Sequence, residues 1–235
     1  MLGADSSMYE TYLAALADLF YPQRCVGCER RASDLLCRAC FEALPEVGSP
    51  VCGRCGMPTA FETFVCEECK NVDFGFESAR APLRYEGVGK EIVHALKYRG
   101  YIRVADRLAA PLMVGVLDEG HRFDAVVPVP LHRSRLRRRG FNQAELLARG
   151  VAQKINAPVS DTLEVVRRTR DQVDLSATER RENVAGAFSP RGRVRGTILL
   201  IDDVFTTGAT MSSCAEGLLH AGATEVHALS LCRTV

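Results

Sequence analysis

Residues 198–210, ILLIDDVFTTGAT, carry the clearest indication of the fold of this chain. Four consecutive apolar residues are typical of a strand that is buried on both faces, as in the parallel sheet of an α/β protein. We expect this strand to stop at Asp202 and Asp203 and a helix to begin near Ala209. The segment therefore predicts a strand–turn–helix unit whose turn lies at the edge of the sheet where α/β folds bind ligands.

The turn of this unit has the chemistry of a sugar-phosphate site. Carboxylates accept hydrogen bonds from sugar hydroxyls, and backbone N–H groups at a helix N-terminus bind phosphate. The alternative is a buried strand with Asp and Thr only as helix caps. Because neighbouring strand residues point to opposite faces, one aspartate is expected to be mainly structural, and the pattern leaves open which one. The full string favours a ribose 5-phosphate, with hydroxyls on Asp202 and Asp203 and the phosphate on Thr206, Thr207, Gly208, Ala209 and Thr210.

The length and composition of the chain fit one α/β domain with a smaller module. Its 235 residues are 47% hydrophobic, which suffices for an α/β domain of about 150 residues and a further unit. No apolar run approaches the roughly 18 residues of a membrane span, and residues 11–20 lack the basic flank of a signal peptide. We expect a cytoplasmic protein with a helix at 1–21, a cysteine-rich module at 22–75 and the α/β domain at 76–235.

Charge is distributed unevenly along the chain. The formal net charge is +1, but residues 1–78 hold 6 basic and 12 acidic residues, and residues 79–235 hold the other 24 basic and 17 acidic ones. An anionic ligand is therefore expected on the second part.

Eight of the ten cysteines form four C-x-x-C pairs. Two such pairs supply the four thiolates of the tetrahedral site that zinc prefers. A disulfide framework is less expected in a cytoplasmic chain, and an iron–sulfur cluster is a further alternative. We predict two structural zinc sites; a sequential grouping is the simplest, and an interleaved one stays open. The sequential sets are Cys25, Cys28, Cys37 and Cys40, then Cys52, Cys55, Cys66 and Cys69.

The surroundings of the cysteine pairs favour a structural or protein-binding role. Gly27, Gly53 and Gly56 lie within or beside the pairs, where tight turns need a positive φ. Zinc bound to four thiolates adds negative charge to a segment that is already acidic, whereas nucleic-acid contacts need Lys and Arg. The isolated Cys214 and Cys232 are expected to be core residues.

The remaining segments predict further α/β units. We expect strands at 76–85, 124–130 and 225–231, and helices at 87–99 and 103–117. Since only four residues follow the last of these strands, a pocket for an acceptor would have to be roofed by residues 1–100.

Five arginines lie between 133 and 139, in a predicted loop that follows the strand at 124–130 and precedes a helix to about Lys154. Guanidinium groups pair bidentately with phosphate oxygens, so this loop suits a pyrophosphate. A solvated basic loop and a DNA-contacting patch are the alternatives.

Four motifs resemble those of known families. The stretch 198–210 is similar to the loop of type I phosphoribosyltransferases that binds 5-phosphoribosyl 1-pyrophosphate (PRPP). Together with the cysteine pairs, VPVPLHRSRLRRRGFNQ at 127–143 and QVDLSATERRENVAGAF at 172–188, it resembles the ComF family over nearly the whole chain. The resemblance implies a type I phosphoribosyltransferase-like α/β fold with an N-terminal double zinc ribbon, and a role linked to DNA uptake.

The resemblance also implies site residues and partners. Residues 167–188, with a capping box at Ser176 and Glu179, correspond to a flexible loop that closes over PRPP and excludes water; a surface helix and turn is the alternative. The ligand would be PRPP with magnesium, with an acceptor that the sequence does not indicate. A non-catalytic PRPP or nucleotide sensor, or a factor that binds single-stranded DNA or a DNA-uptake helicase, is the alternative function. The implied residues are Asp202, Asp203 and Arg180 for catalysis, His132, Arg133 and Arg139 for pyrophosphate, and Gln172, Arg180 and Asn183 in the flexible loop.

Overall fold

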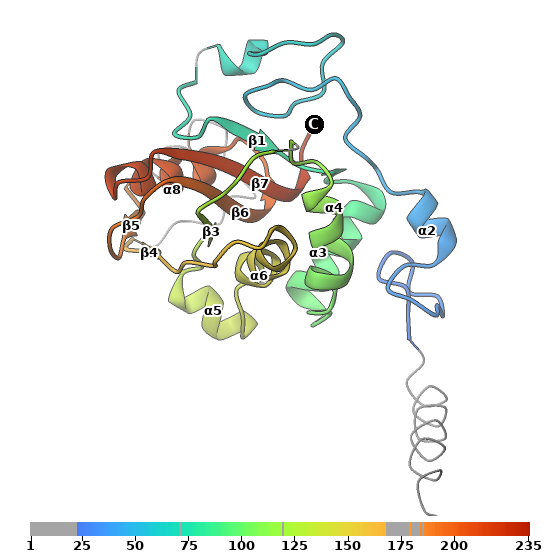
Figure 1. The fold of residues 1–235 in the computed structure, drawn as a ribbon. Coiled ribbons are helices and arrows are strands. Elements are labelled where there is room, and N and C mark those ends of the chain that lie inside the picture. Colours follow the sequence, from blue (N-terminus) through green and yellow to red (C-terminus); the bar gives the residue numbers. More distant parts are fainter. Residues whose placement is uncertain (1–22, 71, 119, 168–178, 180–183, 185) are drawn as a thin grey trace, which may run out of the picture.

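The computed structural model describes residues 23–70, 72–118, 120–167, 179, 184 and 186–235 (Figure 1). The helix expected at 1–21 lies outside these residues. So do three of the predicted loop residues, Gln172, Arg180 and Asn183.

A parallel sheet forms the centre of the molecule, as the sequence predicted (Figure 1). Its order is β1–β7–β6–β3, and the short β2 pairs with β7 beyond the end of β1. Val127 of β3 lies opposite Leu200 of β6, and Ile201 lies opposite Leu229 of β7. The strands are β1 (Ser78–Arg80), β2 (Leu83–Arg84), β3 (Ala125–Pro128), β6 (Thr197–Phe205) and β7 (Glu225–Arg233).

Helices cover both faces of this sheet, and β6 and β7 are consequently buried along most of their length. Ile201 and Leu229 share one core with α3 (Gly87–Tyr98) and α6 (Gln143–Ile155). Leu200 and Val226 share the core on the other face with α8 (Ala209–His220). The order β6–turn–α8 confirms the predicted strand–turn–helix unit.

Strand β6 is longer than expected. It does not stop at the two aspartates but continues to Phe205, with Val204 opposite Cys232 and Phe205 opposite Arg233. Val and Phe are favourable strand residues, and β7 runs beside them for its full length. Asp202 and Asp203 consequently lie within the strand rather than after it.

Residues 133–139 are helical, so the predicted loop is wrong. The short helix α5 (Arg133–Arg139) is composed of good helix formers, and the Nδ1 atom of His132 accepts a hydrogen bond from the N–H of Ser134 at its start. Gly140, with φ +87°, ends it in the left-handed conformation.

Proline residues and pairing between distant segments account for the smaller differences between the predicted and the observed helices and strands. The strand expected at 76–85 is divided into β1 and β2 around Pro82, which lacks an N–H donor. The helix expected at 103–117 is a π-helical segment, η2 (Ala105–Ala109), followed by α4 (Ala110–Val114), with Pro111 at the junction. An antiparallel pair that the sequence did not predict joins β4 (Leu163–Val165) to β5 (Phe188–Pro190).

The cysteine-rich module contains little regular structure: α2 (Arg38–Glu42) and the 3₁₀ turn η1 (Glu67–Cys69). Within the part of the chain that the structure describes, no helix is long and apolar enough to cross a membrane.

Candidate functional site

The two aspartates near the end of β6 face different helices. Asp203 is buried, and its Oδ2 atom forms an ion pair with the Nζ atom of Lys97 at the end of α3. Asp202 is partly exposed, and its Oδ1 atom accepts the backbone N–H of Asp203 at 2.8 Å. Asp202 lies two residues after Leu200, on the face of β6 that packs toward α8, and its negative charge adds to burial in raising the pKa of Cys214 on that helix. Asp203 is therefore the aspartate that forms the buried ion pair with Lys97.

These surroundings separate the pKa values of the two carboxyl groups. Burial favours a neutral Asp203, but the ammonium group of Lys97 outweighs it and lowers the pKa of Asp203. Burial, reinforced by repulsion from Asp203, raises the pKa of Asp202 well above its usual range. Burial also disfavours the charge on Lys97, yet attraction to Asp203 raises the pKa of Lys97. Asp203 and Lys97 are both charged at neutral pH, and Asp202 is the carboxyl group that takes up a proton more readily.

The turn between β6 and α8 requires glycine at its last position. Gly208 has φ +76°, which disfavours other residues. A Cβ atom there would also lie 2.7 Å from the ring of Phe205 and 2.9 Å from the ring of Phe74. Gly208 occupies the N-cap position of the twelve-residue α8 and provides no side-chain cap. The N–H of Ala209 at the start of α8 donates to Oγ1 of Thr207 at 3.5 Å, and backbone N–H groups at the start of a helix are suited to an anion.

Helix α5 brings one arginine close enough to the acidic pair for its charge to act on Asp203. The guanidinium group of Arg139 lies over the ring of Tyr98, 5.3 Å from its centroid, and donates to the Oε1 atom of Gln143. Its positive charge contributes to the lowered pKa of Asp203. Arg133 is exposed in the first turn of α5, at the opposite end from Arg139, and His132 caps the helix.

The residues after α5 hold this arrangement in place. Asn142 donates from Nδ2 to the carbonyl oxygen of Val129, just beyond β3, at 3.0 Å. Its Oδ1 atom accepts the N–H of Ala144 and caps α6. Asn142 and Gln143 therefore connect α5 and α6 to the carboxyl edge of the sheet.

Sequence reasoning missed three residues of this site: Lys97, Tyr98 and Gln143. Lys97 lies in the last turn of an amphipathic helix, where a lysine is common because it complements the helix dipole, so its position gave no sign of a role in the site. Gln143 belongs to the motif at 127–143 that the sequence analysis identified, but no role was predicted for Gln143 itself. The sequence held no signal for Tyr98.

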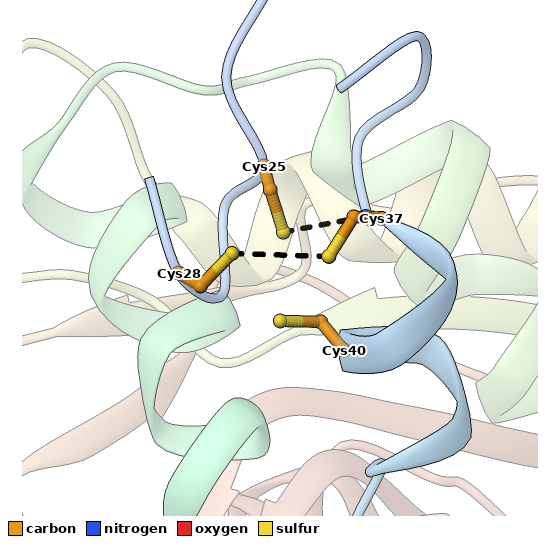
Figure 2. A group of neighbouring side chains, drawn as sticks. All are labelled: Cys25, Cys28, Cys37 and Cys40. Atoms are coloured by element: carbon orange, nitrogen blue, oxygen red, sulfur yellow. Dashed lines mark hydrogen bonds between the residues drawn. The ribbon is translucent and has the colours of Figure 1, made fainter. Parts of the chain in front are cut away.

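The first cysteine set converges on a single point (Figure 2). The four Sγ atoms of Cys25, Cys28, Cys37 and Cys40 lie within 4.8 Å of one another, and those of Cys28 and Cys37 are 3.8 Å apart. Four thiolates around a tetrahedral zinc ion are separated by about 3.8 Å, and a disulfide requires about 2.0 Å. Arg30, whose Nε atom is 3.4 Å from the sulfur of Cys28, lowers the pKa of this thiol to about 6. The donor set and its spacing fit zinc.

The second set has the same geometry, which makes the grouping sequential. The Sγ atoms of Cys52, Cys55, Cys66 and Cys69 also lie within 4.8 Å of one another. The sulfur of Cys66 is 3.7 Å from that of Cys55 and 3.6 Å from that of Cys69.

The prediction that three glycines near the cysteines need a positive φ is correct only for Gly56, at +72°. Gly27 and Gly53 are needed for close packing instead. A Cβ atom would lie 3.1 Å from the sulfur of Cys40 at the first position and 3.1 Å from the ring of Phe64 at the second.

Two arginines attach the cysteine clusters to the α/β domain. Arg99, just after α3, donates to the carbonyl oxygen of Val26 at 2.8 Å and to Oε1 of Glu29 at 2.6 Å, beside the first cluster. Arg233, at the end of β7, is 2% exposed. It donates to the carbonyl oxygen of Cys55 in the second cluster and lies over the ring of Phe205. The first cluster is therefore joined to α3, which carries Lys97, and the second cluster to β7, which pairs with β6.

The fold and site define a class: a phosphoribosyltransferase-like α/β domain preceded by a zinc ribbon with two four-cysteine clusters. Two family models match the chain, the double zinc ribbon domain over residues 16–70 and the phosphoribosyl transferase domain over residues 139–234.

Curated relatives extend the similarity over most of the chain. DNA utilization protein YhgH of Salmonella typhimurium is 34% identical over 85% of this chain and 91% of its own length. Competence protein F of Haemophilus influenzae is 29% identical over 91% of this chain and 98% of its own, and competence protein ComFC of Bacillus subtilis is 26% identical over 87% and 86%. The chain belongs to the ComF family.

Proposed function

We propose that the protein binds PRPP at the carboxyl edge of its sheet and transfers the phosphoribosyl group to an acceptor. The observation that carries this proposal is the acidic pair of β6, followed by a glycine turn at the head of α8. The ribose hydroxyls would be held by Asp202 and Asp203. The 5-phosphate would lie on the backbone N–H groups and hydroxyls of Thr206, Thr207, Gly208, Ala209 and Thr210.

The pyrophosphate group belongs near α5 in this proposal. Arg139 supplies a guanidinium group that Tyr98 and Gln143 hold in place beside the acidic pair. His132 and Arg133 at the other end of α5 are further candidates. Magnesium would accompany the pyrophosphate and neutralise part of its charge. The bond from the anomeric carbon to pyrophosphate breaks, the acceptor forms a bond to that carbon, and the positive charge that develops on the sugar is stabilised by the neighbouring carboxylates.

Two further assignments complete the proposal. Gln172, Arg180 and Asn183, outside the described residues, would belong to the loop that excludes water, with Arg180 in contact with the reacting groups. Both cysteine clusters would hold structural zinc. The protein would act in the cytoplasm, where free thiols stay reduced.

Calorimetric titration of Mg-PRPP into the zinc-loaded protein tests this proposal. We expect binding by the wild type and no binding by Asp202→Asn/Asp203→Asn, because the ribose hydroxyls lose their charged acceptors. Asp106→Asn, at an exposed position of η2, is the control and should bind as the wild type does. A wild-type protein that does not bind near millimolar PRPP would refute the proposal.

The exposed arginines of α5 favour a second candidate, a non-catalytic PRPP or nucleotide sensor or a factor that binds single-stranded DNA. Arg133, Arg137 and Arg138 are exposed on this helix, and the relatives carry the names of DNA-utilization and competence proteins. A helicase of DNA uptake would then be the partner of the acidic ribbon.

Binding of an oligonucleotide at several salt concentrations tests this second candidate. Each phosphate contact on a single strand contributes about 0.7 to the slope of log affinity against log salt. Arg137→Ala/Arg138→Ala should therefore lower the slope by about 1.4, and Arg149→Ala on α6 should not. DNA affinity that is equal in all three proteins would exclude α5 as the contact.

A further inference from the structure

The last two residues of helix α3 and the residue that follows it contact three different parts of the protein. Lys97 forms the ion pair with Asp203 of β6. The ring of Tyr98 lies under Arg139 of α5. Arg99 binds Val26 and Glu29 of the first cysteine cluster. The C-terminal turn of α3 thus connects the acidic pair of β6, helix α5 and the first cysteine cluster, here called the first ribbon.

The ion pair between Lys97 and Asp203 is mostly withdrawn from water. The side chain of Lys97 is 17% exposed and that of Asp203 is 6% exposed. Buried ion pairs contribute little stability compared with apolar residues of the same volume, because both charges lose their hydration. The pair therefore calls for an explanation other than the stability of the fold.

The position of the pair supplies that explanation. Asp203 lies near the carboxyl end of β6, two residues before the end of the strand. Lys97 engages its Oδ2 atom, which restricts the orientation of the carboxylate. Other titratable groups also act on Lys97 or respond to its charge: Asp202, Tyr85, Tyr98 and Cys232. Lys97 is thus the cation that stabilises a negative charge on Asp203 directly.

The attachment of α3 restricts Lys97 in turn. Besides the two contacts to the first ribbon, Arg99 donates to the carbonyl oxygen of Glu91, earlier in α3, at 2.8 Å. The end of α3 is therefore held from the ribbon side, two residues beyond Lys97. Contact with the ribbon and contact with Asp203 occur within the same helical turn.

We propose that Lys97 is a positioning residue of the ligand site, which pairs with the Asp203 carboxylate and holds it in one orientation for the ribose hydroxyls. The ribbon contacts of Arg99 keep Lys97 in place. This inference rests on the proposed binding of PRPP and deepens it, because it assigns to α3 and the first ribbon a part in that site.

Titration calorimetry with Mg-PRPP on the full zinc-loaded chain tests the inference. Lys97→Met should weaken binding by at least about tenfold, since Asp203 loses its charge partner. Lys97→Arg should restore the affinity to within about threefold of the wild type, because it keeps the cation. Lys90→Met is the matched control: Lys90 is exposed on the same helix, and this variant should bind like the wild type.

A second variant and a second readout separate positioning from packing. Lys97→Gln removes the charge and keeps a side-chain N–H donor on a slightly shorter side chain, so it replaces Lys97→Met if the latter does not fold; the same tenfold loss is expected. Carbon-13 NMR of the Asp203 carboxyl group should show its pKa below the usual range in the wild type and in Lys97→Arg, and raised in Lys97→Gln.

The outcomes distinguish this inference from the proposed function. If Lys97→Gln binds PRPP with wild-type affinity, or if the pKa of Asp203 is unchanged in that variant, the role of Lys97 is refuted and the proposed function stands. Absence of PRPP binding by the wild type would overturn the proposed function and the inference together.

Discussion

At the residue scale, the site depends on a few positions where only one residue type fits. Gly208 combines a positive φ with rings of Phe205 and Phe74 that leave no room for a Cβ atom. Asp203 combines deep burial with an ion pair to Lys97. The sequence predicted the importance of both Gly208 and Asp203, but only as members of a motif. The structure supplies the contacts that make each one necessary.

Replacement of Gly208 by alanine should therefore destabilise the protein. The left-handed backbone and the close aromatic rings together should lower the free energy of unfolding by about 2 kcal/mol or more. Urea denaturation of the zinc-loaded protein measures this change.

Gly217→Ala is the matched control within the same helix. A Cβ atom at Gly217 has ordinary contacts, the nearest at 3.5 Å, and alanine is the better helix former. We expect this variant to be as stable as the wild type or up to about 1 kcal/mol more stable. Equal destabilisation by the two substitutions would contradict the argument from the conformation and packing of Gly208.

At the element scale, local patterns predicted most strands and helices but not where they end. Strand β6 was recognised from its apolar run, yet it continues through the aspartates because β7 pairs with residues 204 and 205. Residues 133–139 were predicted as a loop because they lie between a predicted strand and a predicted helix, but they form helix α5. The contacts of α3 with β6, α5 and the first ribbon join residues far apart in the chain, so no local pattern could reveal them.

The connection from α3 to the first ribbon makes a prediction at this scale. Arg99→Ala removes the hydrogen bonds to Val26 and Glu29, which should lower the free energy of unfolding by about 1–3 kcal/mol. One of the two bound zinc equivalents should then be released to a colorimetric chelator faster than in the wild type. The second cluster is attached through Arg233 and should keep its zinc.

Arg103→Ala is the control for this experiment, because Arg103 is exposed and follows α3 by only a few residues. It should release both zinc equivalents at the wild-type rates. Identical release from Arg99→Ala and the wild type would show that α3 does not support the first cluster.

At the scale of the whole molecule, the sequence by itself determined the class of the protein. Apolar runs and cysteine spacing are short-range patterns, and they were sufficient to predict a parallel α/β sheet and two four-cysteine clusters. The sugar-phosphate site at residues 202–210 stays a prediction. Only the tertiary structure decided which aspartate is buried, which cation faces it and how the ribbons attach to the sheet. The physical reason is that burial and charge pairing depend on segments distant in sequence, here α3, β6 and the first cluster, which only the packed fold brings together.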